Sequence, residues 1–242
     1  MVGRVIQLAV VMPVYNEERV IRDVIIKWVK ELLRLDIDFQ IHVYNDGSKD
    51  NTLSILNHLA NENKNIIVHN KSNSGHGPTI IQGYLENSNA EWLFQIDSDD
   101  GIDTESFEDL WLNRNRFHFL IGKRIRSHQA FTRKLISSIS RIIVSILYGN
   151  KIYDVNSPYR LMKTESIKNI LFSLPDNMFA PNVAIAGVVS LLNLKCYEIS
   201  VHQRERVSGE GSLKRKKLLK AVLQSFYQTI IYRFQIKKYF SF

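Results

Sequence analysis

The chain has 242 residues, of which 45% are hydrophobic, and its formal net charge is +8 at pH 7. This length fits one large domain, or one domain with an appendage, and the apolar content is ample for a core. The single cysteine, Cys196, excludes an internal disulfide. The positive charge indicates an anionic partner, such as a nucleotide, a lipid phosphate, a membrane surface or nucleic acid.

The amino-terminal residues do not resemble a signal peptide, because Met1-Val-Gly-Arg4 leads directly into a strand-like run. The longest apolar stretch, Val183 to Leu192, is too short to span a bilayer. We therefore expect a cytoplasmic protein that is peripheral on the cytoplasmic face of the membrane.

Predicted strands and helices alternate in the first half of the chain. A continuous apolar run from Leu8, typical of a buried parallel strand, breaks at Pro13 to Asn16. Apolar residues then recur at helical spacing from Val20 to Leu33, with Asn16 as the expected N-cap. Further strands are expected at 39–44, 65–69 and 91–96, and helices at 52–60 and 79–86. This order favours an α/β fold with a mostly parallel sheet and right-handed crossovers.

The strand that ends at Ile96 is followed directly by three carboxylates, Asp97, Asp99 and Asp100. Open α/β sheets bind ligands beyond the carboxyl ends of their strands. Carboxylates there suit Mg²⁺ or Mn²⁺, which take one or two protein carboxylates and complete their shell with substrate phosphates. Asp, Ser and Gly are also ordinary turn residues, so this run taken alone leaves a metal site and an acidic turn equally open.

The second half is less regular. We expect helices at 107–113 and 184–194, strands at 117–121 and 195–201, and a loop followed by a strand from Asp154 to Met162. Two longer segments, 131–148 and 214–242, place apolar residues beside cations, as both core helices and interfacial membrane helices do. We favour the core for the first and the membrane surface for the second. The expected division is a domain at 1–213 and a basic amphipathic helical tail at 214–242.

Four short motifs each follow a predicted strand. They are Met12-Pro-Val-Tyr-Asn-Glu17, Asn45-Asp-Gly-Ser-Lys-Asp50, Ser74-Gly-His-Gly77 and Asp97-Ser-Asp99. Each motif alone is weak, but the ordered set strongly resembles the family-2 glycosyltransferases over roughly residues 6–215. The resemblance implies a nucleotide-sugar-binding α/β fold of the GT-A type, with helices on both sides of a mostly parallel sheet.

The second half narrows the resemblance to the dolichol-phosphate-mannose-synthase-like branch, whose members move a sugar onto a polyprenyl phosphate. The supporting features are Gly122-Lys-Arg124, Arg133, Asp154-x-x-x-x-Tyr-Arg160-Leu-Met162, and Arg206 with Gly211-Ser212-x-Lys214. Two positions depart from the branch. Asn45 stands where an aspartate is frequent, and Gly101, preceded by the extra acid Asp100, stands where a glutamine is frequent.

The resemblance assigns the donor site to residues of the first half. It implies contacts with a UDP- or GDP-linked sugar from Pro13, Tyr15, Glu17 and Asp46, close backbone approach at Gly75 and Gly77, and Mg²⁺ or Mn²⁺ on Asp97 and Asp99. The alternative interpretation of the same residues is structural: the end of a strand, a helix cap and an ordinary loop before a helix. His76 is expected to be a loop residue.

The resemblance assigns the acceptor site to the second half. A phosphate acceptor has a second pKa of about 6 and needs cations more than a general base. The implied cations are Arg124, Arg133, Arg206 and Lys214, for which a solvated basic surface is the alternative. Asp154 would act near the reacting centre, either as a base or by orienting basic side chains. The family implies direct displacement with inversion at the anomeric carbon, and no Ser/His or Cys/His arrangement offers a covalent route.

Three other functions compete with this hypothesis. A glycosyltransferase that uses a sugar hydroxyl as acceptor fits the motifs up to Asp99 equally well. A nucleotidyltransferase usually has a glycine-rich basic loop after its first strand, which Met12 to Glu18 lacks. A nucleic-acid-binding protein is compatible with the charge, but no known nucleic-acid motif is present, so we expect no nucleic-acid partner.

Overall fold

The computed structural model describes residues 5–125, 138, 141–142, 144–149, 152–203 and 215–240, with only the backbone from 215 to 222.

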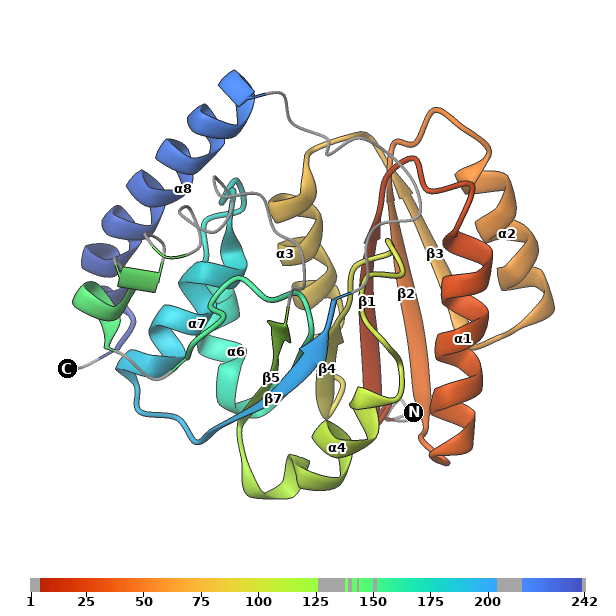
Figure 1. The fold of residues 1–242 in the computed structure, drawn as a ribbon, viewed down its shortest axis with the longest axis horizontal. Helices are drawn as coiled ribbons and strands as arrows, with labels where there is room; N and C mark the ends of the chain where they lie inside the picture. Colours follow the sequence, from red (N-terminus) through yellow and green to blue (C-terminus); the bar gives the residue numbers. More distant parts are fainter. Residues whose placement is uncertain are drawn as a thin grey trace.

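Seven strands form one sheet. Their bounds are β1 Leu8–Val14, β2 Phe39–Asp46, β3 Ile66–Lys71, β4 Trp92–Gln95, β5 Phe119–Ile125, β6 Arg160–Lys163 and β7 Cys196–His202. The strand order is β3-β2-β1-β4-β6-β5-β7, and β6 alone runs antiparallel to its neighbours (Figure 1). The predicted α/β sheet is confirmed.

Helices cover both faces of the sheet. The helices are α1 Ile21–Arg34, α2 Thr52–Glu62, α3 His76–Glu86, α4 Ser106–Asn113, α6 Thr164–Ser173, α7 Pro181–Leu191 and α8 Arg215–Gln235, with short 3-10 turns η1 Arg114–Arg116 and η2 Ile236–Lys238. Residues 144–148 are also helical, whereas most of the predicted helix at 131–148 lies outside the described residues.

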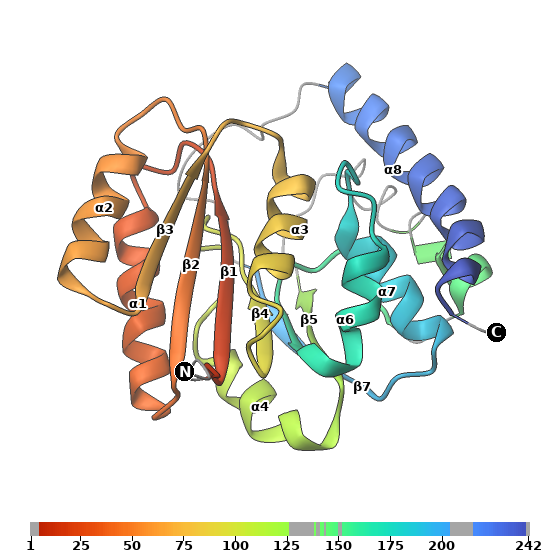
Figure 2. The ribbon, with the colours of Figure 1, turned by 180° about the vertical axis from the view of Figure 1, so that it is seen from behind.

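The alternation of side chains along β1 produces two separate cores. Leu8, Val10 and Met12 face α1, α2 and α4, whereas Ala9 and Val11 face α3, α6 and α7. Figure 2 shows α3 and α6 in front of the sheet on this second face. A strand buried on both faces is hydrophobic throughout, which explains the continuous apolar run in the sequence.

The predicted break of the first strand at Pro13 is wrong, because β1 continues to Val14 and pairs with β2 along its whole length. Val11 accepts a hydrogen bond from Ile96 on the β4 side, so the nitrogen of Pro13, two residues later, points to the same side. The strand pairing with β4 ends at Val11. Pro13 therefore removes no hydrogen bond from the sheet.

Three helix predictions need correction. α1 begins at Ile21 rather than after Asn16, which has a left-handed backbone with φ of 55°. α3 and α7 each begin three residues before their predicted starts, and Pro181 at the start of α7 is the residue type that the first helical turn accepts. α6 was not predicted, although Ile167, Ile170 and Leu171 have helical spacing and are buried.

α8 packs against the second core along one side. Tyr232 and Ile236 are buried there, the Tyr232 and Ser173 hydroxyls are 2.6 Å apart, and Tyr148 donates a hydrogen bond of 2.7 Å to the carbonyl of Thr229. Among the described residues, no helix has the length and hydropathy needed to cross a bilayer.

His42 on β2 is a buried titratable group whose ring lies against His69 on β3. Its exposed fraction is 8%, and its Nδ1 lies 3.1 Å from Nε2 of His69. Burial, followed by repulsion from His69, lowers the pKa of His42 to about 4. The unfolded chain, with an ordinary pKa near 6.5, therefore binds a proton between these values that the folded chain does not.

We expect acidification from pH 7.5 to pH 5 to remove about 2 kcal/mol of unfolding free energy through His42 alone. This stability is complete above pH 6.5 and falls as the pH drops toward 4, because the unfolded state gains the proton. The unfolding free energy of the His42→Gln variant, measured in urea at both pH values, should lack this part of the pH dependence that the wild type shows. His58→Gln, a substitution at an exposed position on α2, is the control. Its unfolding free energy should depend on pH as that of the wild type does.

Candidate active site

The predicted donor motifs meet at the carboxyl ends of β1, β2 and β4. These strands are parallel, so the residues that follow them, among them Tyr15, Asp46 and Asp97, come to the same edge of the sheet. Tyr15 is 43% exposed, whereas Asp46 is buried. Pro13 is buried inside β1, two residues before Tyr15.

Asp46 organises the loop between β3 and α3. Its carboxylate accepts hydrogen bonds from the backbone amides of Ser74 at 2.8 Å and Gly75 at 2.9 Å, and it forms a short ion pair with Lys71. Burial acts to raise the pKa of Asp46, but the bonds from Lys71, Ser74 and Gly75 outweigh it and hold the pKa below its ordinary value. Asp46 is therefore a fixed anion that joins the second motif to the third.

The first two motifs are tied together by their own side chains. The amide of Asn16 donates to Ser48 Oγ and the amide of Lys49 donates to Asn16 Oδ1, at 2.9 and 2.8 Å. The amide of Glu17 donates to Thr52 Oγ1 at 2.9 Å. Asn16 is therefore a clamp between two loops instead of the predicted helix cap. The clamp holds Tyr15 and Glu17 beside Asp46.

Glycine is required at the two positions of the third motif for different structural reasons. Gly75 precedes α3 with φ of 93°, a conformation that side-chain-bearing residues rarely adopt, and a Cβ there would meet nothing within 4 Å. At Gly77 a Cβ would lie 2.2 Å from the carbonyl oxygen of Met178. Gly77 is thus required for packing against the segment before α7, a tertiary contact that the sequence does not show.

His76, expected to be a loop residue, is instead the first residue of α3 and lies next to the acidic run. Its Nε2 is 3.2 Å from Asp97 Oδ1. Desolvation acts to lower the pKa of His76, but the hydrogen bond and the charge of Asp97, with smaller effects of Asp46 and Asp99, raise it above its ordinary value. Asp46 is bonded to Gly75, Asp97 lies beside the next residue, His76, and Asp99 is two residues from Asp97. We call the side chains of Asp46, His76, Asp97 and Asp99 the acidic cluster.

The three acids of the fourth motif separate into two groups. Asp99 Oδ1 accepts a hydrogen bond of 3.1 Å from the amide of Gly101, and a Cβ at Gly101 would lie 2.8 Å from the same oxygen. Asp100 has a left-handed φ of 53° and pairs with Lys27 on α1 at 2.7 Å. Asp100 therefore does not cap α4, which begins at Ser106, and its carboxylate is paired with α1.

Asp97 and Asp99 fit a divalent cation that binds together with a diphosphate. Mg²⁺ commonly uses one or two protein carboxylates and fills its other positions with water and phosphate oxygens. Among the described residues, no three His, Cys, Asp or Glu side chains form a complete metal site. Two carboxylates are the donor set that a substrate-bridged ion requires, and His76 is at hand as a nitrogen donor beside Asp97.

On the other side of the sheet edge, Arg124 and Asp154 bind each other. Arg124 Nε and NH2 donate to the two oxygens of Asp154 at 2.7 and 2.9 Å, and both side chains are mostly buried. The pair supports the interpretation that Asp154 orients a basic side chain. Glu198 on β7 accepts a hydrogen bond of 2.8 Å from the amide of Tyr153, which fixes the chain just before Asp154.

We expect Arg124→Met and Asp154→Leu each to lower the unfolding free energy by about 3 kcal/mol, because each leaves its partner as an uncompensated, largely buried charge. The double variant leaves no such charge and should cost clearly less than the sum of the two. Urea unfolding of the four proteins gives the coupling energy. Additive costs would show that the two side chains do not depend on each other.

Arg160, a residue of the predicted acceptor motif, is entirely buried at the start of β6. Its guanidinium donates to three backbone carbonyls: Ser157 at 2.9 and 2.5 Å, Asn182 at 3.1 Å and Val155 at 3.3 Å. Burial lowers the pKa of Arg160 to about 10, against the opposing charges of Tyr84, Asp154 and Asp97. Arg160 therefore holds the loop that carries Asp154 in shape. The sequence motif that contains Arg160 did not reveal this structural role.

Three predicted acceptor residues, Arg133, Arg206 and Lys214, lie outside the residues that the structure describes. Their role stays a prediction. Two other cations lie near the described part of this side: Lys123 Nζ and the Arg141 guanidinium are 3.8 and 4.4 Å from the ring centre of Tyr153. The ring holds two positive charges close to the Arg124–Asp154 pair.

The sheet order, the single antiparallel strand and the acids gathered at the carboxyl edge define the GT-A fold. Residues 9–174 match the family described as Glycosyl transferase family 2. The chain belongs to this family, as the ordered motifs predicted.

Similar curated proteins include transferases that act on polyprenyl phosphates. The chain is 24% identical to an undecaprenyl-phosphate 4-deoxy-4-formamido-L-arabinose transferase of Proteus mirabilis, over 88% of this chain and 64% of that protein. It is 25% identical to a dolichyl-phosphate beta-glucosyltransferase of Dictyostelium discoideum, over 83% and 67%. The chain thus spans about two thirds of the length of these relatives.

Similar solved structures share the fold. Glucosyl-3-phosphoglycerate synthase from Mycobacterium tuberculosis, in complex with Mn²⁺, UDP-glucose and phosphoglyceric acid, has a TM-score of 0.67 at 14% identity, over 96% of this chain and 80% of that one. Residues 1–349 of TarS from S. aureus, in complex with UDP-GlcNAc, have a TM-score of 0.62 at 19% identity, over 93% and 66%.

Proposed function

We propose that the protein transfers a sugar from a nucleoside diphosphate-sugar to a polyprenyl phosphate, with inversion and with the aid of Mg²⁺ or Mn²⁺. The observation that carries the proposal is the cluster of Asp46, His76, Asp97 and Asp99 at the carboxyl edge of the sheet. Relatives named for transfer to undecaprenyl or dolichyl phosphate support the acceptor class.

In this proposal the clamped loops bind the nucleotide. Tyr15 is exposed enough to meet the base, Glu17 lies near the ribose, and Asp46 holds the Ser74–Gly75 turn against the nucleotide. Asp97 and Asp99 face the diphosphate. A divalent cation bound by them would neutralise the charge that develops on the diphosphate as the sugar leaves.

The acceptor side is suited to an anion. Arg124 is held rigidly by Asp154, so its position costs little conformational entropy when a phosphate arrives. Lys123 and Arg141 add charge nearby. A phosphate needs no general base, whereas a sugar hydroxyl does. The cations Lys123 and Arg141, and relatives named for transfer to polyprenyl phosphates, support a phosphate acceptor over the competing hydroxyl acceptor.

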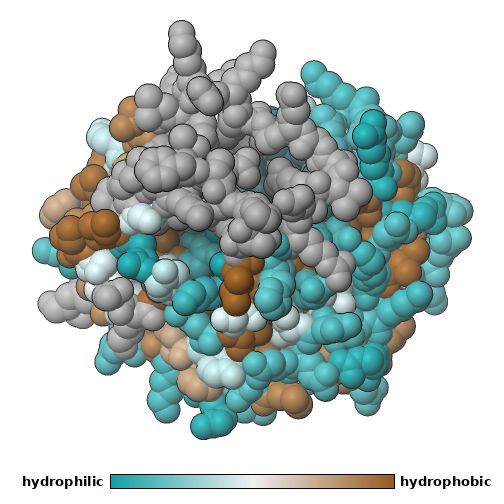
Figure 3. Space-filling view, in the orientation of Figure 1, coloured by the Kyte–Doolittle hydropathy of each residue, from teal (hydrophilic) through white to brown (hydrophobic). Residues whose placement is uncertain are grey.

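A lipid-linked acceptor requires contact with a membrane, and α8 offers a surface for it. Leu223, Tyr227, Ile230 and Phe234 follow one face of α8 and are between 39% and 67% exposed. We call this surface the outer face of α8. Figure 3 shows hydrophobic side chains gathered on the side of the molecule where α8 lies. Apolar side chains beside lysines are typical of a helix in a membrane interface.

We expect the wild-type protein to sediment with vesicles that contain anionic lipid, and the Tyr227→Glu/Phe234→Glu variant to bind them at least fivefold less. The two glutamates oppose burial of the outer face and repel anionic headgroups. Leu33→Glu/Leu112→Glu, at two exposed positions on α1 and α4, is the charge-matched control and should bind normally. Equal loss in the control would attribute the effect to net charge alone.

The catalytic proposal is tested by incubating the protein with Mn²⁺, a panel of UDP- and GDP-sugars, and either undecaprenyl phosphate or soluble sugar acceptors. Formation of a lipid-linked sugar with inverted anomeric configuration is the expected result. Turnover only with hydroxyl acceptors would contradict the acceptor assignment. Tight binding to DNA without any binding of nucleotide sugars would contradict the enzyme assignment.

A further inference from the structure

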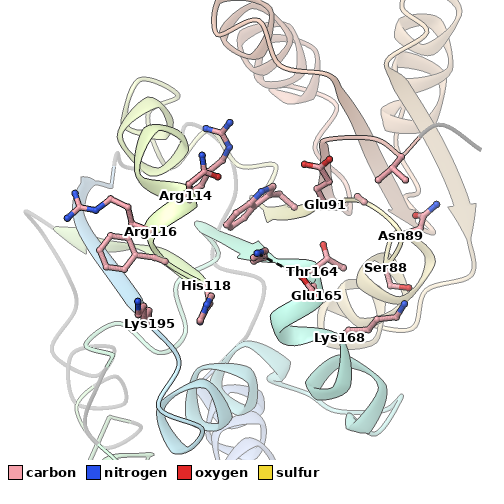
Figure 4. A pocket seen from close by; sticks show the side chains of 16 residues that line it. Ser88, Asn89, Glu91, Arg114, Arg116, His118, Thr164, Glu165, Lys168 and Lys195 are labelled. Atoms are coloured by element: carbon pink, nitrogen blue, oxygen red, sulfur yellow. Dashed lines mark ion pairs between the residues drawn. The ribbon is translucent and has the colours of Figure 1, made fainter.

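A polar pocket lies at the opposite edge of the sheet from the acidic cluster. It has a volume of about 630 Å³ and is bounded by the start of β4, the end of β6, η1 and the residues just before β5 and β7 (Figure 4). Because β6 is antiparallel, its last residue, Lys163, and the first turn of α6 enter the pocket from this edge. The volume is within the range of small-molecule sites.

Basic side chains dominate the lining. Five of the lining residues are cations and two are carboxylates: Arg114, Arg116, Lys163, Lys168, Lys195, Glu91 and Glu165. Figure 4 shows Arg114 and Arg116 on one side of the first turn of α6, and Lys168 on the other. Of the described residues, none forms an ion pair with Lys168 or Lys195, and Lys163 lies 3.9 Å from the exposed carboxylate of Glu165.

Arg114 is positioned in advance for a ligand. Its guanidinium lies 3.8 Å from the centre of the Trp111 ring and donates a hydrogen bond of 2.6 Å to the Trp111 carbonyl. These contacts fix the side chain without neutralising its charge. The lining therefore contains a rigid cation as well as flexible lysines.

The first turn of α6 adds hydrogen-bond donors. Lys163, the residue before the helix, makes no side-chain hydrogen bond to this turn. Thr164 is 4% exposed, and its hydroxyl has no hydrogen-bond partner among the described residues. Its side chain points toward the middle of the labelled side chains in Figure 4. A buried hydroxyl without a partner destabilises the fold, and a ligand that accepts a hydrogen bond from it would remove this cost.

We propose that this pocket binds a small phosphate-bearing anion. The oxygens of such a ligand accept hydrogen bonds from the Thr164 hydroxyl and from the amides of Glu165 and Ser166, whereas the Thr164 amide already donates to the Glu91 carbonyl. Lys168, Lys195 and Arg114 balance the charge of the ligand. The concave shape suits a small molecule, whereas a nucleic acid or an acidic protein needs a wider surface. The proposal does not depend on the reaction at the other edge of the sheet.

The test uses the full chain and inorganic pyrophosphate, titrated calorimetrically in the presence of EDTA so that no divalent metal supports binding at the acidic cluster. We expect Lys168→Ala/Lys195→Ala to weaken binding at least tenfold and Thr164→Val at least threefold. Lys64→Ala removes an exposed cation before β3 and should bind like the wild type. Thermal unfolding of each variant shows that the fold is retained.

The Glu165→Gln variant should increase the affinity for pyrophosphate instead of lowering it. It removes a negative charge from the first turn of α6 and releases Lys163, so pyrophosphate should bind at least twofold more tightly. Absence of pyrophosphate binding would overturn the proposal, and so would binding that none of the pocket variants changes. Preferential binding of duplex DNA or an acidic peptide, lost in the same variants, would overturn the assignment to a small anion.

Discussion

Asp99→Asn is expected to lower kcat/KM for sugar transfer by about 10²–10³-fold, the loss typical when charge stabilisation at a reacting group is removed. Asparagine keeps the oxygen that accepts the Gly101 amide, so the loop should keep its shape and the protein its stability. What is lost is the negative charge that holds a cation against the diphosphate. The measurement is the initial rate of lipid-linked sugar formation at saturating Mn²⁺.

The neighbouring variant Asp100→Asn is the matched control. Asp100 pairs with Lys27 on α1, so its loss should change the rate less than threefold. An equal loss of activity in both variants would show that the acidic run acts as a turn and not as a metal site. Titration of Mn²⁺ by calorimetry in the presence of UDP provides a second comparison, in which only Asp99→Asn should weaken binding.

Arg160→Met is expected to have the largest effect on stability, a loss of about 3–5 kcal/mol of unfolding free energy. Methionine fills much of the space, but the carbonyls of Val155 and Ser157 would lose their guanidinium donor in the core. The Asn182 carbonyl would keep only the hydrogen bond that it accepts within α7. Arg160→Lys should also destabilise, because one ammonium group cannot replace a planar guanidinium that reaches three acceptors. Urea unfolding followed by circular dichroism measures both.

Lys163→Met, three residues later on the same strand, is the control for this prediction. Its side chain is 44% exposed, so its replacement should change the unfolding free energy by less than about 0.5 kcal/mol. If Arg160→Met were as stable as this control, the buried hydrogen bonds would contribute nothing to the fold.

Local patterns were sufficient to predict much of the donor half. The apolar runs of β1 and β2 and the helical spacing after Val20 are short-range signals. Parallel strands then bring the residues at their ends together, so Asp46, Asp97 and Asp99 could be placed at one edge from their order alone. The role of Asp97 and Asp99 in binding a metal ion stays a prediction.

Contacts between distant segments could not be predicted in the same way. Asn16 reads locally as a helix cap, but its partner Ser48 is in the next loop. The motif around Gly77 indicates that the backbone approaches a nucleotide closely. It does not show that Met178, from the second half of the chain, packs against Gly77. Arg124 and Asp154 could each be assigned to the acceptor site, but only their shared geometry shows that they act as a pair.

The reversed direction of β6 has a consequence for the evolution of this chain. β5 ends and β6 begins at the same edge of the sheet, so the segment between them starts and finishes at neighbouring points. The free energy needed to close a connection between such points grows only slowly with its length. A change of length in this connection would therefore leave β1, β2 and β4, which lead to Asp46 and Asp97, in register.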